Sequence, residues 1–117
     1  LKGDVMDVHM ETVGSVTVCR LAGRLDMGGT DLFRSTLGKI AEEGSGPVVL
    51  NLEEIAFIGS ACLGALVSFH QKLGSDRALA LCGLSVPIHK MFKVAAFDRI
   101  FQIVPTQDDA VALVGGN

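Results

Sequence analysis

A short apolar run near the middle of the chain constrains the fold more than any other stretch. Residues 48–52 read Val-Val-Leu-Asn-Leu and follow the helix-breaking segment Gly-Ser-Gly-Pro at residues 44–47. The run is rich in β-branched residues and too short for a helix, so it predicts a buried strand. We expect a turn over residues 53–59 and then a helix over residues 61–73, with an apolar face made of Leu63, Leu66, Val67, His70 and Leu73.

Ser60 stands between this strand and this helix, at the expected N-cap position. One interpretation is a hydroxyl that accepts a hydrogen bond from a free N–H group of the first helical turn, a contact worth about 1 kcal/mol. The same helix end also suits an anion, because its N–H groups are unpaired and the helix dipole is positive there. A phosphate on Ser60 is therefore a second interpretation, and the chemistry of the residues leaves both open.

The rest of the chain alternates strands and helices after an opening hairpin. We expect strands over residues 5–10 and 16–21, a helix over 30–43, the central strand and helix, a strand over 78–82, a helix over 87–96, a strand over 100–104 and a helix over 107–114. The order β-β-α-β-α-β-α-β-α predicts an α/β fold, a small mixed sheet with a parallel part flanked by helices. Leu32, Phe33, Leu37 and Ile40 form the expected apolar face of the first helix, and Thr106 is the expected N-cap of the last.

Composition limits the classes of function. The chain has 117 residues, of which 49% are hydrophobic, so a single folded core is expected. A net charge of −3 argues against a nucleic-acid partner, whose binding surface is normally basic. No apolar run approaches the ~20 residues that cross a membrane, and no signal peptide is visible. We therefore expect a cytoplasmic protein without membrane insertion.

The cysteines and histidines do not form a metal-binding pattern. Cys19, Cys62 and Cys82 are odd in number and lack close pairing, which argues against a disulfide framework. Cys19 and Cys82 lie in expected strands and should behave as small buried hydrophobic residues. Cys62 lies in the first turn of a helix, where a thiol pKa can be lowered, but packing is the preferred interpretation. The histidines at positions 9, 70 and 89 are widely spaced, so we predict no metal and no cofactor.

Two patterns match catalytic or nucleotide-binding motifs only in part. Ser60 lies on a strand-to-helix connection, as a hydrolase nucleophile does, but Ile58 and Cys62 occupy the two positions where the nucleophile elbow needs glycine. Several expected turn residues also separate the strand from Ser60. The glycine pair at residues 28–29 lacks the spaced glycines of a phosphate-binding loop. We predict no catalytic residues and no enzymatic activity.

Two segments resemble the signature of STAS domains, and more narrowly that of bacterial anti-sigma factor antagonists. The first is NLEEIAFIGSACLG at residues 51–64, where the family has a strand ending in Asn-Leu or Asp-Leu and then Asp-Ser-(Ser/Thr/Ala)-Gly-Leu-Gly. The second is LAGRLD at residues 21–26, which is similar to the family's Gly-(Glu/Arg)-Leu-Asp turn. The resemblance implies one STAS-like domain over residues 1–117, with a core over about residues 5–114.

The resemblance also implies a regulatory role. It makes Ser60 the phosphorylated serine, and it places the partner-binding surface at Asp26, Gly59, Ser60, Ala61, Cys62 and Leu63. The implied partner is an anti-sigma factor with serine kinase activity, with a phosphatase as an optional second partner, and the implied outcome is control of sigma-factor-dependent transcription. The alternative is a scaffold subunit of a transport or stress-signalling complex, with Ser60 unmodified. The oligomeric state stays open.

Two positions depart from the family signature. Gly59 stands where an acidic residue is common before the serine, and Cys62 stands where glycine is common two residues after it. A carboxylate and a bare backbone are therefore both missing beside the acceptor. We expect these departures to make the chain a slower kinase substrate than relatives with Asp-Ser-Ser-Gly.

Overall fold

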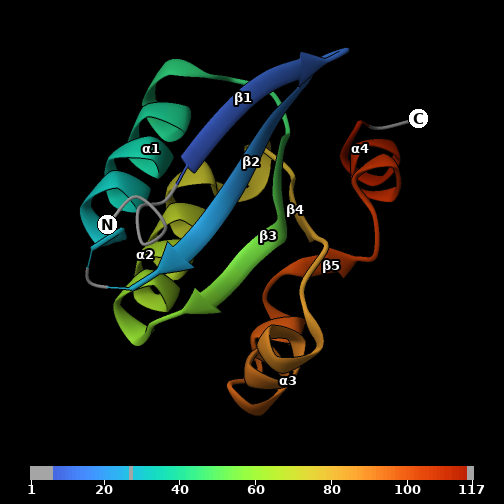
Figure 1. Ribbon diagram of the computed structural model, residues 1–117. Helices are drawn as coiled ribbons and strands as arrows, with labels where there is room; N and C mark the ends of the chain where they lie inside the picture. The colour runs from blue at the N-terminus through green and yellow to red at the C-terminus, as the bar shows by residue number, and fades with distance from the viewer. Residues whose placement is uncertain (1–6, 27, 116–117) are drawn as a thin grey trace.

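The computed structural model describes residues 7–26 and 28–115, which form a five-stranded sheet with helices on both faces (Figure 1). Its strands are β1 (Asp7–Val13), β2 (Val16–Leu25), β3 (Val48–Ile58), β4 (Leu79–Cys82) and β5 (Gln102–Val104). Its helices are α1 (Thr30–Glu43), α2 (Ser60–Leu73), α3 (Val86–Val94) and α4 (Gln107–Val114), with short 3₁₀ turns η2 (Gly74–Asp76) and η3 (Phe97–Arg99). The predicted α/β class and element order are confirmed. The predicted domain limits include residues outside the described part and stay a prediction.

The sheet is mixed in the predicted way. Its strand order is β1-β2-β3-β4-β5, and β1 pairs with β2 as an antiparallel hairpin. The hairpin turns at Gly14, whose φ of 61° lies in the left-handed region that glycine adopts without strain. The other three pairings are parallel. The predicted first strand began at residue 5, and residues 5 and 6 lie outside the described part.

The central strand is buried on both faces, which explains its continuous apolar run. Val48 and Leu50 belong to the larger core, beneath α1 and α2, whereas Val49 belongs to the smaller core beneath α4. Figure 1 shows α1 and α2 on one side of the sheet and α4 on the other. The larger core also takes in α3 through Ile88 and Phe92.

A hydrogen-bonded network of three side chains, Asn51, Gln107 and Glu11, connects α4 to the sheet. Asn51, only 6% exposed, donates from Nδ2 to Oε1 of Gln107 at 2.9 Å and accepts the backbone N–H of Glu53 at 2.9 Å. Gln107 in turn donates from Nε2 to Oε2 of Glu11 at 3.1 Å. The buried amide is therefore satisfied, and it joins β3 to α4 and β1. Thr106 caps α4 as predicted, since its Oγ1 accepts the N–H of Asp109 at 3.1 Å.

Strand β3 is longer than the sequence indicated. The predicted turn over residues 53–59 is wrong, because the strand continues to Ile58 and pairs with β2 through Arg24↔Phe57 and Leu25↔Ile58. Register shifts in this pairing disturb the alternation of exposed and buried residues that normally marks a strand. Long-range pairing with β2 therefore extends the strand beyond its local signal.

The apolar faces of two helices also differ from prediction. The buried residues of α2 are Cys62, Leu66, Phe69 and Leu73, so the helix is rotated relative to the predicted face, and Leu63, Val67 and His70 are only half-buried. In α1, Leu32 is 42% exposed while the other three predicted residues are buried. Among the described residues, no helix combines the length and the apolar character needed to cross a membrane.

Removal of Asn51 from this hydrogen-bonded network should reduce the stability of the fold. Asn51→Ala removes the partner of the Gln107 amide and of the Glu53 N–H, so we expect the free energy of unfolding to fall by about 2 kcal/mol. Gln102→Ala, a substitution at an exposed strand position, is the control and should change it by less than about 0.5 kcal/mol. Urea denaturation measures both. Equal stability of Asn51→Ala and the wild type would contradict the structural role of this amide.

Candidate functional site

The candidate site lies where β3 passes into α2, beside the end of β2. The N–H of Gly59 donates to the carbonyl of Leu25 at 2.7 Å, so the parallel pairing of the two strands continues to this residue. A Cβ atom on Gly59 would stand 3.3 Å from that carbonyl oxygen and 3.9 Å from the Cα of Asp26. The absence of a side chain at Gly59 therefore lets the two chain segments approach closely.

Ser60 is the first residue of α2 rather than its cap, which corrects the prediction. Gly59 is the N-cap residue, with extended backbone angles (φ −87°, ψ 166°), and no side chain caps the helix. Only this one residue separates strand from helix, because β3 continues to Ile58. Ser60 is exposed, and its hydroxyl makes no hydrogen bond with any described residue. The Ser60 hydroxyl therefore lies on the surface without a partner in the described part of the chain.

The start of α2 keeps free hydrogen-bond donors beside Ser60. The N–H groups of Cys62 and Leu63 both donate to the Gly59 carbonyl, each at 3.1 Å. The N–H groups of Ser60 and Ala61 precede the first intrahelical bond and have no acceptor within the helix. Together with the positive end of the helix dipole, they favour negative charge at this end.

Asp26 stands next to Gly59 and organises the turn that leads into α1. Its Oδ1 accepts the N–H of Gly28 at 3.1 Å, and its carbonyl accepts the N–H of Gly29 at 3.0 Å and the Thr30 hydroxyl at 2.7 Å. Its carboxylate also pairs with Nε of Arg24 at 3.2 Å, with the Asp26 side chain 33% exposed. The structure therefore brings Asp26 and the start of α2 together on one edge of the sheet.

Sequence reasoning missed an aromatic and a cation on this edge. The guanidinium of Arg24 lies 4.7 Å from the centroid of the Phe57 ring, and Phe57 is 38% exposed. The two residues are direct neighbours in the β2–β3 register. The sequence does not reveal this pair, because the expected turn over residues 53–59 assigns no cross-strand neighbour to Phe57. Aromatic residues and arginine are both enriched at protein–protein interfaces, and a guanidinium over the face of an aromatic ring is a favourable contact.

The predicted contact residues do not all face outward. Ser60 and Ala61 are exposed, Gly59 and Leu63 are half-buried, and Leu63 packs against the larger core. Cys62 is 1% exposed, and its Sγ lies 3.5 Å from Oγ1 of Thr30. Its side chain points into the space between α2 and the start of α1, so the expectation that it forms part of the contact surface is wrong.

The other two thiols are also buried, as predicted. Burial raises the pKa of Cys19 from 9.0 to about 12. Burial, followed by the negative charge of Glu53, raises the pKa of Cys82 to about 11. Both thiols therefore stay neutral and pack as small apolar groups at physiological pH.

Two kinds of catalytic site can be compared with this geometry. Among residues 7–26 and 28–115, no group of three or more His, Cys, Asp or Glu side chains could hold a metal ion. The connection from β3 to Ser60 is as short as that of a nucleophile elbow, which removes one of the two arguments against a hydrolase. The other stands, since Ile58 and the buried Cys62 occupy the glycine positions of that motif.

Comparisons with known proteins agree with the fold. Residues 7–110 match the model of the STAS domain family. The anti-sigma F factor antagonist of Paenibacillus polymyxa is 25% identical over 108 residues, which cover 91% of this chain and 90% of that protein. The anti-sigma-F factor antagonist RsfB of Mycobacterium tuberculosis is 20% identical over 113 residues, 97% of this chain and 93% of that protein. The crystal structure of an anti-sigma factor antagonist from Mycobacterium paratuberculosis superimposes with a TM-score of 0.89 at 23% identity, covering 96% of both chains.

The raised thiol pKa values predict a pH dependence of stability. Above pH 9 the Cys19 thiol ionises in the unfolded chain but stays protonated in the folded one, whose pKa is about 12. Its contribution to stability is complete below pH 9 and is lost as the pH rises toward 12. Urea denaturation at pH 7 and pH 10 should show a loss that is about 1 kcal/mol larger in the wild type than in Cys19→Ala. Equal losses in the two proteins would contradict a buried neutral thiol at Cys19.

Proposed function

The chain belongs to the STAS domain family, and we propose that it is an anti-sigma factor antagonist that is switched off by phosphorylation of Ser60. In its unmodified form it binds an anti-sigma factor that is also a serine kinase, and so frees a sigma factor. A phosphatase that restores Ser60 is an optional second partner. The observation that carries the proposal is an exposed, unbonded serine hydroxyl at the start of α2, at the position that matches the family's phosphorylated serine.

The surface around Ser60 suits a protein contact. Ser60 and Ala61 are small and exposed, so a partner can approach the start of α2 closely. Phe57 offers an exposed ring near the end of β3, and Arg24 and Asp26 are charged groups on the adjacent β2 side. An aromatic anchor with a charged rim is the usual composition of a binding surface.

A phosphate on Ser60 is tolerated by the fold but not by the contact. It adds about −1.5 to −2 charges at neutral pH. The free N–H groups of Ser60 and Ala61 and the helix dipole favour that charge, so the folded structure should survive. In a closed interface without a cationic partner, the dianion must lose its water. A loss of only ~3 kcal/mol on docking weakens binding more than a hundredfold.

The proposal predicts the behaviour of substitutions at Ser60. Ser60→Ala should bind the cognate anti-sigma factor as tightly as the wild type and escape inactivation by the kinase. Because Ser60 makes no cap hydrogen bond, we expect this substitution to change the free energy of unfolding by less than about 0.5 kcal/mol. Ser60→Asp and the phosphorylated protein should bind weakly, the phosphorylated protein by more than about a hundredfold. Isothermal titration of the anti-sigma factor with the four proteins measures this.

If all four proteins bind alike, Ser60 is not the switch. A chain that binds no anti-sigma factor but copurifies with transport or stress-signalling proteins would favour the scaffold alternative, in which Ser60 stays unmodified.

The two departures from the family signature, Gly59 and Cys62, should have different effects. Gly59→Asp restores the common carboxylate beside the exposed hydroxyl, so it should raise the rate of phosphorylation by the cognate kinase. Cys62→Gly removes a buried side chain instead, so we expect a loss of about 1 to 2 kcal/mol of stability. Phosphate incorporation and urea denaturation of the two single variants separate the effects. Because a Cβ atom at Gly59 would stand 3.3 Å from the Leu25 carbonyl, Gly59→Ala is the matched control. Equal rates in Gly59→Asp and Gly59→Ala would show that the carboxylate does not determine the rate of phosphorylation.

A further inference from the structure

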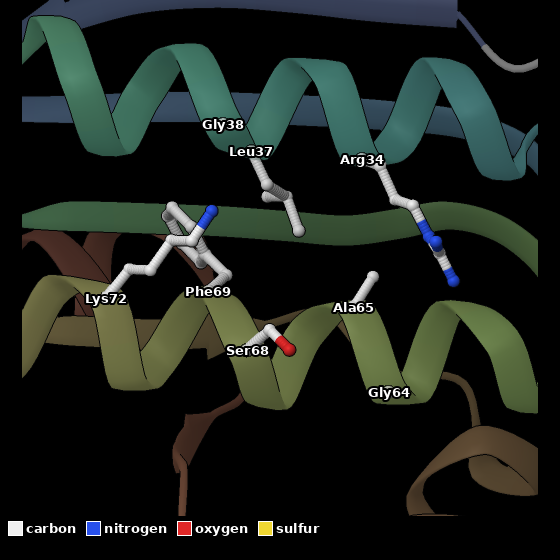
Figure 2. A pocket seen from close by; sticks show the side chains of 8 residues that line it. All are labelled: Arg34, Leu37, Gly38, Gly64, Ala65, Ser68, Phe69 and Lys72. Carbon is white, nitrogen blue, oxygen red and sulfur yellow. The ribbon is translucent and has the colours of Figure 1, made fainter.

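A groove runs between α1 and α2 on the outer side of the larger core (Figure 2). The two helices run in the same direction, as residue numbers increase the same way along both. The groove has a volume of about 280 Å³ and is open to solvent. The surface around Ser60 does not account for it, and among the described residues no segment of the chain fills it.

The groove is cationic at both ends. None of its lining residues is acidic, and two of them are Arg34 and Lys72. Figure 2 shows Arg34 reaching from α1 toward α2 at one end and Lys72 reaching from α2 toward α1 at the other. Both are exposed, and neither makes an ion pair or a side-chain hydrogen bond with any residue in the described ranges. The two charges therefore face the groove, and no described residue pairs with either of them.

The middle of the groove is apolar and hollow. Its floor is formed by the buried side chains of Leu37 and Phe69. Gly38 and Gly64 lie inside α1 and α2 at different levels along the groove, and a Cβ atom on either would meet no atom within 4 Å. Glycine inside a helix costs stability relative to alanine, and here neither packing nor a positive φ requires it. The two glycines therefore leave the hollow open, although alanine at either position would make its helix more stable.

The groove lies close to Ser60 along α2. Ser60 and Gly64 are four residues apart on α2, about one helical turn, so they are neighbours on the surface of that helix, and Lys72 lies further along the same inclined row of side chains. A partner that contacts Ser60 therefore meets the groove one helical turn further along.

We propose that the α1–α2 groove docks an acidic segment of the protein that binds at Ser60. Carboxylates of that segment pair with Arg34 and Lys72, and a small apolar residue between them rests on Leu37 and Phe69. The inference rests on the proposed function in one respect, since it assigns the segment to the anti-sigma factor.

The exposure of both cations favours a tethered segment over a free small anion. Ion pairs at exposed side chains are individually weak, so a lone anion gains little at either end. A segment joined to a partner already bound at Ser60 acts at a high effective concentration, and weak contacts then add to the affinity.

The first test compares charge reversals in the titration of the cognate anti-sigma factor. Arg34→Glu and Lys72→Glu should each raise Kd by about fivefold or more. Lys39→Glu is the matched control, because it makes the same charge change on α1 but faces the separate groove beside β1. It should change Kd by less than about twofold. The effect of Arg34→Glu should shrink as salt is raised.

A groove-filling variant separates docking from stability. Gly38→Leu places a side chain in the open space and improves the helix, so the melting temperature should rise or stay the same while Kd increases about fivefold or more. A destabilised variant cannot give that combination.

The second test uses a synthetic twelve-residue peptide of alternating Glu and Leu, and glutarate as a small anion, added to the ¹⁵N-labelled protein. The peptide should shift the amide resonances of Gly38 and Gly64 in the wild type and in Lys39→Glu but not in Arg34→Glu. Glutarate at the same concentration should leave them unchanged. Equal shifts from glutarate would identify a small-anion site and overturn the docking proposal.

The two proposals fail in distinguishable ways. If the anti-sigma factor binds the wild type, Arg34→Glu, Lys72→Glu and Gly38→Leu alike, the groove proposal is overturned and the proposed function stands. If it does not bind the wild type at all, the proposed function fails. The peptide titration, carried to millimolar peptide to match the effective concentration of a tethered segment, then decides the groove by itself, and absence of the peptide shifts overturns it.

Discussion

The hydrogen bond between the Gly59 N–H and the Leu25 carbonyl, 2.7 Å long, is the contact on which the candidate site depends. It continues the parallel pairing of β2 and β3 to the ends of both strands, and it leaves no room between them for an ordinary loop. Helix α2 must then begin at Ser60, beside the Asp26 turn that leads into α1. One backbone contact therefore brings together a serine and an aspartate that stand far apart in the sequence.

Much of the fold could be predicted because its signals are local. The apolar periodicity of α1 and the threonine cap of α4 lie within their own segments, and both helices have the predicted bounds. The second half of β3 could not be predicted in the same way. Glu53, Glu54 and Ala56 are exposed, and only pairing with β2, about thirty residues earlier in the chain, keeps the segment extended.

The main residues of the candidate site could be predicted from the sequence, but the directions of the side chains around them could not. The motif identified Ser60 and Asp26, and the structure places them on one edge. The side chains around them depend on where the helix starts and how it is rotated, which follow from the Gly59 contact and from burial of Leu66 and Phe69. That rotation turns Cys62 into the core and leaves Ser60, Gly64 and Lys72 exposed. The single-residue shift of the helix start also freed the Ser60 hydroxyl from the cap role that the sequence suggested.

We infer that the edge formed by the Asp26 turn and the start of α2 is the partner-binding surface. The most direct measurement is a titration of the ¹⁵N-labelled protein with the cognate anti-sigma factor, followed by amide chemical shifts. We expect the resonances of Gly28, Ser60 and Ala61 to shift or broaden first, while those of Ala110 and Val111 in α4, on the opposite face of the sheet, stay unchanged. Shifts that gather on α4 and leave Ser60 and Ala61 unaffected would contradict it.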